Sequence, residues 1–203
     1  MRIGLDFDNT IICYDDVFLS AAKRKGLLAD SFVGNKQDIR DTIRLLPDGE
    51  TEWQRLQGIV YGRGVADALM FDGVGNFLQR CCESRVPVVI VSHKTEFGHF
   101  DPDRLNLRDA AREWMRAQGF FDRFGLSEQN VFFETTRSEK IARIATLGFT
   151  HFVDDLEEVL TDPDFPEGVS RILFSESDPR PGEGSMLAFR SWRDIENYVF
   201  ASV

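Results

Sequence analysis

Two aspartates stand two residues apart near the start of the sequence, in the segment Leu5-Asp6-Phe7-Asp8-Asn9-Thr10-Ile11. The apolar residues ahead of them are typical of a short buried strand, so both carboxylates fall where that strand should end. Beyond a strand end, the two side chains can turn toward one site. Two facing carboxylates are costly there unless a cation neutralises them, and oxygen ligands suit Mg²⁺. The alternative is a polar strand end in which Asp8-Asn9-Thr10 forms a turn or a helix cap.

Further polar residues follow other predicted strands. Ser92 ends the apolar run 86–91, and Asp154 and Asp155 close the run 151–153. In open α/β sheets, ligands bind at the carboxyl ends of the strands. We therefore expect these side chains to share a site with the two N-terminal aspartates.

Lys140 opens a predicted helix, where its charge opposes the helix dipole. That placement makes sense if Lys140 faces a bound anion, and a freely solvated lysine is the alternative. Because the dipole already disfavours this lysine, its removal is expected to change stability little. Ser92 can also be a simple turn residue, and Asp155 has capping-box spacing with Glu158.

Strand-like runs alternate with helical patterns along most of the chain. This alternation predicts an α/β fold with a doubly wound, Rossmann-like parallel sheet. The expected strands are 3–5, 86–92, 131–133, 151–153 and 171–174. A polar loop over 93–103 and a loop rich in proline and glycine before residue 191 complete the pattern.

The stretch between the opening motif and the second strand has only helical patterns, so we expect a small all-helical insertion. The predicted division is therefore an α/β core at 1–13 and 72–203, with a helical insertion at 14–71. The expected helix starts are as follows: Asn35 precedes a helical pattern, Thr51 and Asp72 cap helices, and Thr136 with Glu139 has capping-box spacing.

The composition narrows the classes of partner. The chain has 203 residues and a net charge of −10, so its bulk charge predicts no binding of a nucleic acid polymer. No apolar run is long enough to cross a bilayer, and the N-terminus lacks the layout of a signal peptide. Three cysteines, two of them adjacent, do not suggest a disulfide framework. A cytoplasmic location is the expectation.

Taken together, the ordered motifs resemble those of the haloacid dehalogenase (HAD) superfamily of phosphohydrolases. Asp6-Phe7-Asp8-Asn9-Thr10-Ile11 is similar to the first motif, and Ser92 and Lys140 match the second and third. Phe152-Val153-Asp154-Asp155 matches the fourth in its double-aspartate form. The helical insertion resembles the cap that many members carry after the first motif.

The resemblance implies a role for each residue. Asp6 would be the nucleophile that forms an aspartyl-phosphate, and Asp8 the general acid and then the base for water. Mg²⁺ would be held by the Asp6 side chain, the Asp8 main-chain carbonyl and Asp154, with Asp155 acting directly or through water. Ser92 and Lys140 would hold the phosphoryl oxygens. The presence of Asp8 argues against the dehalogenase and phosphonate-cleaving branches, which lack this acid.

We therefore predict a Mg²⁺-dependent phosphatase of a small phosphomonoester, with sugar phosphates and nucleotides as leading classes. A phosphomutase would need the same residues. A phospho-binding switch or a non-catalytic scaffold is the alternative from another class. Trp53, Arg55, Tyr61 and Arg63 could form a specificity face or serve as surface or core residues, and His93 or Lys94 could touch substrate. No residue of the insertion identifies the leaving group, and nothing in the sequence sets the oligomeric state.

Overall fold

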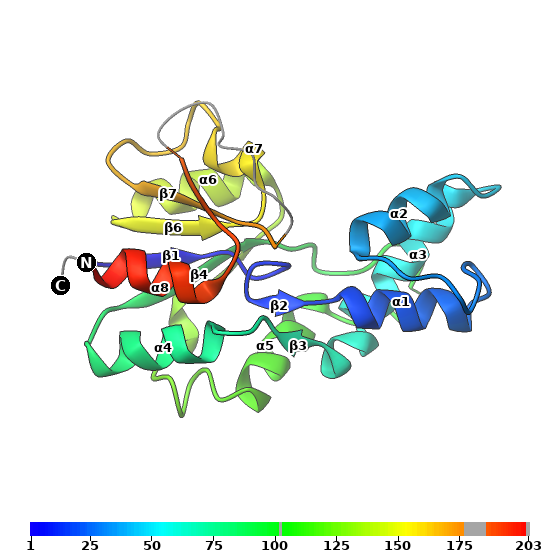
Figure 1. The fold of residues 1–203 in the computed structure, drawn as a ribbon, viewed down its shortest axis with the longest axis horizontal. Coiled ribbons are helices and arrows are strands. Elements are labelled where there is room, and N and C mark those ends of the chain that lie inside the picture. Colours follow the sequence, from blue (N-terminus) through cyan, green and yellow to red (C-terminus); the bar gives the residue numbers. More distant parts are fainter. Residues whose placement is uncertain (102, 177–185, 202–203) are drawn as a thin grey trace. The chain divides into compact units, whose positions relative to one another are not determined.

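The computed structural model describes residues 1–101, 103–176 and 186–201 and contains a parallel sheet of six strands (Figure 1). The six strands lie in the order β5-β4-β1-β6-β7-β8. Their bounds are β1 Ile3–Leu5, β4 Val88–His93, β5 Val131–Glu134, β6 His151–Asp154, β7 Ser170–Phe174 and β8 Leu187–Phe189. All neighbouring pairs are parallel. This confirms the predicted α/β fold with a doubly wound sheet.

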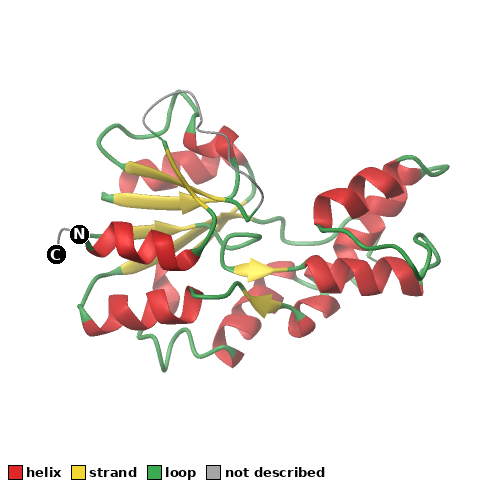
Figure 2. Cartoon of the chain, viewed as in Figure 1, coloured by secondary structure: helices red, strands yellow, loops and turns green. Residues whose placement is uncertain are grey.

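Helices pack on the sheet from both sides (Figure 2). On one side, α4 (Val74–Glu83) and α8 (Trp192–Phe200) meet through Phe77 and Trp192, whose ring centroids are 5.1 Å apart. On the other side lie α6 (Arg137–Thr146) and α7 (Glu157–Leu160). Buried residues of these two helices form one apolar cluster together with buried residues of three strands. The cluster includes Ile144 and Leu160 from the helices, Val89 and Val91 from β4, Phe152 from β6 and Leu173 from β7. The continuous apolar run of β4 fits this arrangement, since both faces of the strand are covered.

Strand β8 is absent from the sequence-based prediction. It has only three residues, all half-buried, and it pairs with β7 alone at the edge of the sheet. Such a short edge strand has no clear hydrophobic signature. The proline- and glycine-rich loop predicted before residue 191 lies partly outside the described residues, at 177–185.

The chain divides into two compact units. Unit 1 contains the six-stranded sheet and comprises Met1–Ile12, Met70–Lys94 and Gly119–Val203; unit 2 comprises Cys13–Leu69 and Thr95–Gln118. The segment Thr95–Gln118 therefore groups with the insertion, whereas the sequence assigned it to the core. The predicted division into an α/β core and a helical insertion stays a prediction.

Unit 2 is mostly helical (Figure 2). Its helices are α1 Asp15–Arg24, α2 Lys36–Arg44, α3 Gly49–Tyr61, the short 3₁₀ helix η1 Arg63–Asp67 and α5 Leu107–Ala117. Two strands of two residues, β2 (Ile12–Cys13) and β3 (Leu69–Met70), pair in a separate sheet. Strand β3 lies inside the stretch that we expected to be all-helical.

Two of the predicted helix starts are correct, and two are wrong. Asn35 and Thr136 each form a capping box. Thr51 instead lies inside α3, and α4 follows Gly73 rather than Asp72. Gly73 has a φ of 87°, a conformation that glycine adopts without the steric cost of a Cβ.

The core of unit 2 is built on aromatic rings. Trp53 is buried and stacks on Phe18, with ring centroids 4.9 Å apart, and Tyr61 meets the same ring edge-on. Trp53 is therefore a core residue, the less specific of its two predicted roles. Arg55 and Arg63 are exposed and pair with Glu52 and Asp103, respectively.

Replacement of Trp53 by alanine should lower the free energy of unfolding by about 3–5 kcal/mol, because it removes a large buried ring and leaves a cavity. The matched control is Arg55→Ala, two residues along the same helix, which loses an exposed ion pair with Glu52 and a cation–π contact with Phe100. This change should lower stability by about 1 kcal/mol or less. Urea unfolding of both variants measures the difference. Equal small losses would contradict the core assignment.

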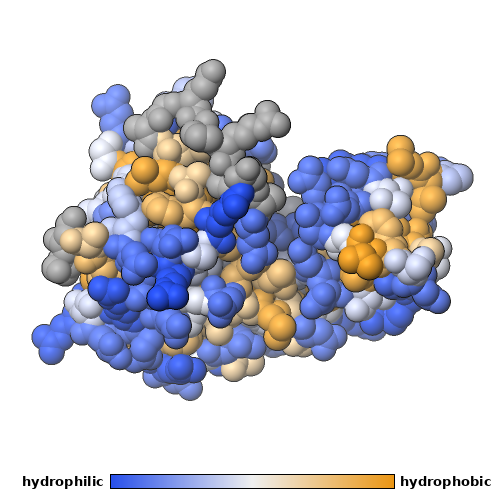
Figure 3. All heavy atoms as spheres, in the orientation of Figure 1, coloured by the Kyte–Doolittle hydropathy of each residue, from blue (hydrophilic) through white to orange (hydrophobic). Residues whose placement is uncertain are grey.

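The visible surface of each unit is mostly hydrophilic, with scattered apolar patches (Figure 3). Among the described residues, no helix has both the length and the apolar character needed to cross a membrane. Cys13, Cys81 and Cys82 are not joined by disulfide bonds. Burial raises the pKa of the Cys81 thiol to about 12, so it behaves as an apolar core residue.

Candidate active site

The three central strands of unit 1 end side by side with polar residues. Strand β1 lies between β4 and β6, and Leu5 is in register with both Ile90 and Val153. Asp6 directly follows β1, Ser92 lies near the end of β4, and Asp154 ends β6. The strand order thus brings together residues that are far apart in the sequence, at the edge where ligands bind in such sheets.

A tight turn follows Asp6. The amides of Ile11 and Ile12 both donate to the carbonyl of Phe7, and Asn9 adopts a positive φ of 60°. Asparagine tolerates this left-handed conformation better than most residues do. The buried indole of Trp192 donates a hydrogen bond of 3.0 Å to the carbonyl of Thr10. These bonds fix the chain around the two aspartates.

Lys140 lies between two of the predicted carboxylates. Its Nζ is 2.6 Å from Asp6 Oδ1 and 2.6 Å from Asp154 Oδ2, and all three side chains are buried. Burial by itself lowers the pKa of Lys140, but the charges of Asp154 and Asp6 outweigh it and raise this pKa. Lys140 is therefore a fully charged ammonium group, and the solvated alternative is excluded.

The carboxylates of Asp6, Asp154 and Asp155 form one group. One oxygen from each lies within 4.8 Å of the others. Thr10 Oγ1 is 3.4 Å from Asp6 Oδ2 and 3.5 Å from Asp155 Oδ1. Burial raises the pKa of Asp154, and the nearby Asp6 carboxylate adds to this effect while Lys140 opposes it. Such a group costs free energy unless positive charge neutralises it.

Asp155 does not cap the helix that follows it. Leu156 occupies the N-cap position of α7, with no side-chain hydrogen bond. The capping alternative for Asp155 is therefore wrong, and its carboxylate belongs to the acidic group instead. Asp154 Oδ1 accepts a hydrogen bond of 3.0 Å from the Leu156 amide, which orients that carboxylate.

Asp8 forms its ion pair with Lys94. Lys94 Nζ is 2.9 Å from Asp8 Oδ1 and 2.7 Å from Asp8 Oδ2. The sequence offered Lys94 only as a residue that could touch substrate. The sequence could have placed Lys94 on the same face as Ser92, because it follows Ser92 by two residues and alternate residues of a strand point to the same face.

The carboxylates of Asp6, Asp154 and Asp155 could hold a metal ion. If all four carboxylates are ionised, Asp6, Asp8, Asp154 and Asp155 carry four negative charges against the two positive charges of Lys94 and Lys140. One divalent cation would cancel the remaining two charges. Closely spaced carboxylate oxygens are the ligands that Mg²⁺ prefers.

Ser92 supplies an unpaired donor. Its hydroxyl is buried and has no hydrogen-bond partner among the residues that the structure describes. A buried hydroxyl without a partner is unfavourable. A bound anion at the end of β4 would satisfy it, whereas a simple turn residue would already bond to its own backbone.

No protein-family model and no curated protein matches the sequence. Solved structures do match it over nearly the whole chain. A haloacid dehalogenase-like hydrolase from Streptococcus pneumoniae has a TM-score of 0.62 at 12% identity and covers 98% of this chain and 97% of its own. A HAD family hydrolase from Deinococcus radiodurans, solved with phosphate and sodium, has a TM-score of 0.54 at 14% identity, covering 98% and 94%.

The chain has a HAD-like fold. Protein Tyrosine Kinase A from Mycobacterium tuberculosis is also similar, with a TM-score of 0.63 at 16% identity and coverage of 98% of both chains. Proteins described as hydrolases and as a kinase thus share this HAD-like fold. At such low identity the comparison establishes the fold alone, so the activity must be argued from the site.

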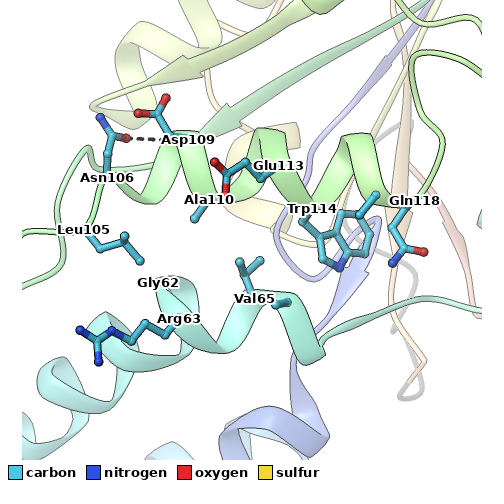
Figure 4. A pocket seen from close by; sticks show the side chains of 12 residues that line it. Gly62, Arg63, Val65, Leu105, Asn106, Asp109, Ala110, Glu113, Trp114 and Gln118 are labelled. Atoms are coloured by element: carbon cyan, nitrogen blue, oxygen red, sulfur yellow. Dashed lines mark hydrogen bonds between the residues drawn. The ribbon is translucent and has the colours of Figure 1, made fainter.

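A pocket of about 560 Å³ lies within unit 2 of the HAD-like chain, between η1 and α5 (Figure 4). Val65, Ala110 and Trp114 form its apolar side, and Arg63 and Glu113 also line it. Of the four residues considered for a specificity face, Arg63 alone lines this pocket. The predicted site residues all lie in unit 1.

Proposed function

We propose that the protein is a Mg²⁺-dependent phosphatase that hydrolyses a small phosphomonoester through an aspartyl-phosphate on Asp6. One observation carries this proposal: the carboxylate of Asp6 contacts the Lys140 ammonium group and shares an acidic group with Asp154 and Asp155. A nucleophilic carboxylate needs positive charge beside it, because the phosphoryl oxygens would otherwise repel it.

Asp6, Asp154 and Asp155 would hold the metal ion, together with the main-chain carbonyl of Asp8. When bound, Mg²⁺ supplies positive charge that draws electrons from the phosphoryl oxygens. Ser92 would donate its free hydroxyl hydrogen to one of those oxygens, and Lys140 would donate to another. Both groups are buried, and their interactions are therefore stronger than they would be in water.

The reaction takes two steps. An oxygen of Asp6 forms a bond to phosphorus while the ester bond breaks, and Asp8 gives a proton to the departing oxygen. Asp8 then takes a proton from a water molecule, which attacks the phosphorus of the aspartyl-phosphate. Free phosphate leaves, and the Asp6 carboxylate is restored.

Sugar phosphates and nucleotides are the proposed substrate classes. The likeness to a structure solved with bound phosphate supports a phosphorylated substrate. The likeness to a protein named as a kinase makes transfer to another acceptor the outcome to exclude. A cytoplasmic location is part of the proposal and rests on the cysteine content of the sequence.

The test is a panel of sugar phosphates, nucleotides and an aryl phosphate, incubated with the protein and Mg²⁺ while free phosphate is measured. Activity should vanish in chelator and return when Mg²⁺ is added, because the acidic group needs a cation to act.

Asp154→Asn should weaken Mg²⁺ binding in calorimetry. The matched control is Asp164→Asn, because Asp164 is an exposed aspartate outside the acidic group. This variant should bind Mg²⁺ as tightly as the wild type does. An isomerised product without free phosphate would indicate a phosphomutase, and full activity after chelation would contradict the metal site.

A further inference from the structure

The ion pair between Lys94 and Asp8 is the feature of the site that the HAD-like motifs do not include. Lys94 Nζ contacts both oxygens of the Asp8 carboxylate, at 2.9 and 2.7 Å. The ammonium group also lies 5.6 Å from the centroid of the Phe7 ring. Lys94 thus contacts the opening motif at two successive residues, Phe7 and Asp8.

The backbone of Lys94 is held in place. Its amide donates a hydrogen bond of 2.9 Å to the carbonyl of Glu134, which continues the pairing of β4 with β5 by one residue. Burial alternates along this strand end, since Ser92 and Lys94 are buried whereas His93 is exposed. The side chains of Ser92 and Lys94 therefore point to the same face of the strand.

Exposure distinguishes the two partners. The Lys94 side chain is 2% exposed, whereas that of Asp8 is 18% exposed. A ligand or a water molecule can therefore reach the carboxylate, while the ammonium group is covered. Lys94 is thus placed to act through Asp8 rather than on a substrate directly, in contrast to the substrate contact considered from the sequence.

We propose that Lys94 is a positioning residue that holds the Asp8 carboxylate in the orientation required for proton transfer. This inference rests on the proposed phosphatase function. Asp8 has three other carboxylates in its site, and the Lys94 ammonium group contacts both of its oxygens from one side. By binding both oxygens, Lys94 keeps this carboxylate apart from Asp6, Asp154 and Asp155, which form a group without it.

The experiment compares the specificity constant kcat/KM of Lys94→Met on two substrates. The first is an aryl phosphate with an acidic leaving group, which needs almost no proton, and the second is an alkyl phosphate, which needs one. A misplaced Asp8 should lower kcat/KM by about 10²-fold on the alkyl phosphate and by less than about fivefold on the aryl phosphate. Asp8→Asn should release phenol from the aryl phosphate only once per site, and adding Lys94→Met to this variant should cause no further loss in the rate of that single release.

Equal losses on both substrates, or a further loss in the Asp8→Asn background, would overturn the proposal. If Lys94→Met does not fold, Lys94→Gln is the second variant: it keeps one donor for Asp8, so its loss on the alkyl phosphate should be smaller but still larger than its loss on the aryl phosphate. Crystal structures of the wild type and the variant give a readout without activity: the Asp8 carboxylate should leave its place in the variant, and an unchanged carboxylate would contradict a positioning role. A wild-type protein that hydrolyses no phosphomonoester would instead refute the phosphatase function, and the crystal comparison would still test the ion pair.

Discussion

The Asp6→Asn variant should release no phosphate from any phosphomonoester that the wild-type protein hydrolyses, a loss of at least about 10⁴-fold. The introduced asparagine would have nearly the same shape as aspartate, but a neutral amide is a poor nucleophile toward phosphorus. The change also removes one of the two negative charges that contact the buried Lys140, and the charge of Asp154 remains. Phosphate release measures the activity, and thermal unfolding verifies that the variant is folded.

The Asp8→Asn variant should behave differently from Asp6→Asn, because Asp6 acts as the nucleophile of the first step whereas Asp8 acts as the acid of the first step and the base of the second. With an aryl phosphate the first step barely needs an acid, but hydrolysis of the aspartyl-phosphate still needs a base. This variant should release at most about one equivalent of phenol per site and then stall. The stalled protein should carry extra mass on the peptide that contains Asp6. Label on another aspartate, or steady turnover by Asp6→Asn, would contradict the assignment of the nucleophile.

The positions of Asp6, Ser92 and Asp154 could be predicted from the sequence because each follows an apolar strand. Parallel strands end at the same edge of a sheet, so the identification of the strands is sufficient to bring these residues together. The structure agrees, with β4, β1 and β6 adjacent in the sheet. Local patterns also identified the helix starts at Asn35 and Thr136, and at Thr136 the capping box with Glu139, since a capping box depends on residues three positions apart.

Pairings between distant side chains could not be predicted. Lys94 and Asp8 are 86 residues apart, and no local pattern shows which of several acidic residues a lysine will meet. The segment Thr95–Gln118 shows the same limit on a larger scale. Helix α5 has one apolar stripe, and such a stripe is equally compatible with packing on the sheet or on other helices. Three-dimensional contacts place it in unit 2.

Burial of Lys140 overturns one expectation from the sequence. A lysine that opposes a helix dipole should be dispensable for stability, but Lys140 is buried and bonded to two carboxylates. Lys140→Met should therefore lower the free energy of unfolding by about 3–5 kcal/mol in chelator, because it leaves Asp6 and Asp154 without their cation. It should also lower phosphoryl transfer by about 10²–10³-fold, since it removes positive charge beside the reacting group.

Arg143→Met is the matched control on the same helix. Arg143 is exposed and pairs with Glu134 at 2.8 Å, a surface ion pair whose loss should cost about 0–1 kcal/mol and leave turnover unchanged. Urea unfolding with and without Mg²⁺ adds a second comparison. A bound divalent cation supplies positive charge to the same carboxylates, so the destabilisation of Lys140→Met should be smaller with Mg²⁺ than in chelator. An equal loss under both conditions would mean that the cation does not neutralise Asp6 and Asp154, and an active Lys140→Met variant would remove this lysine from the catalytic site.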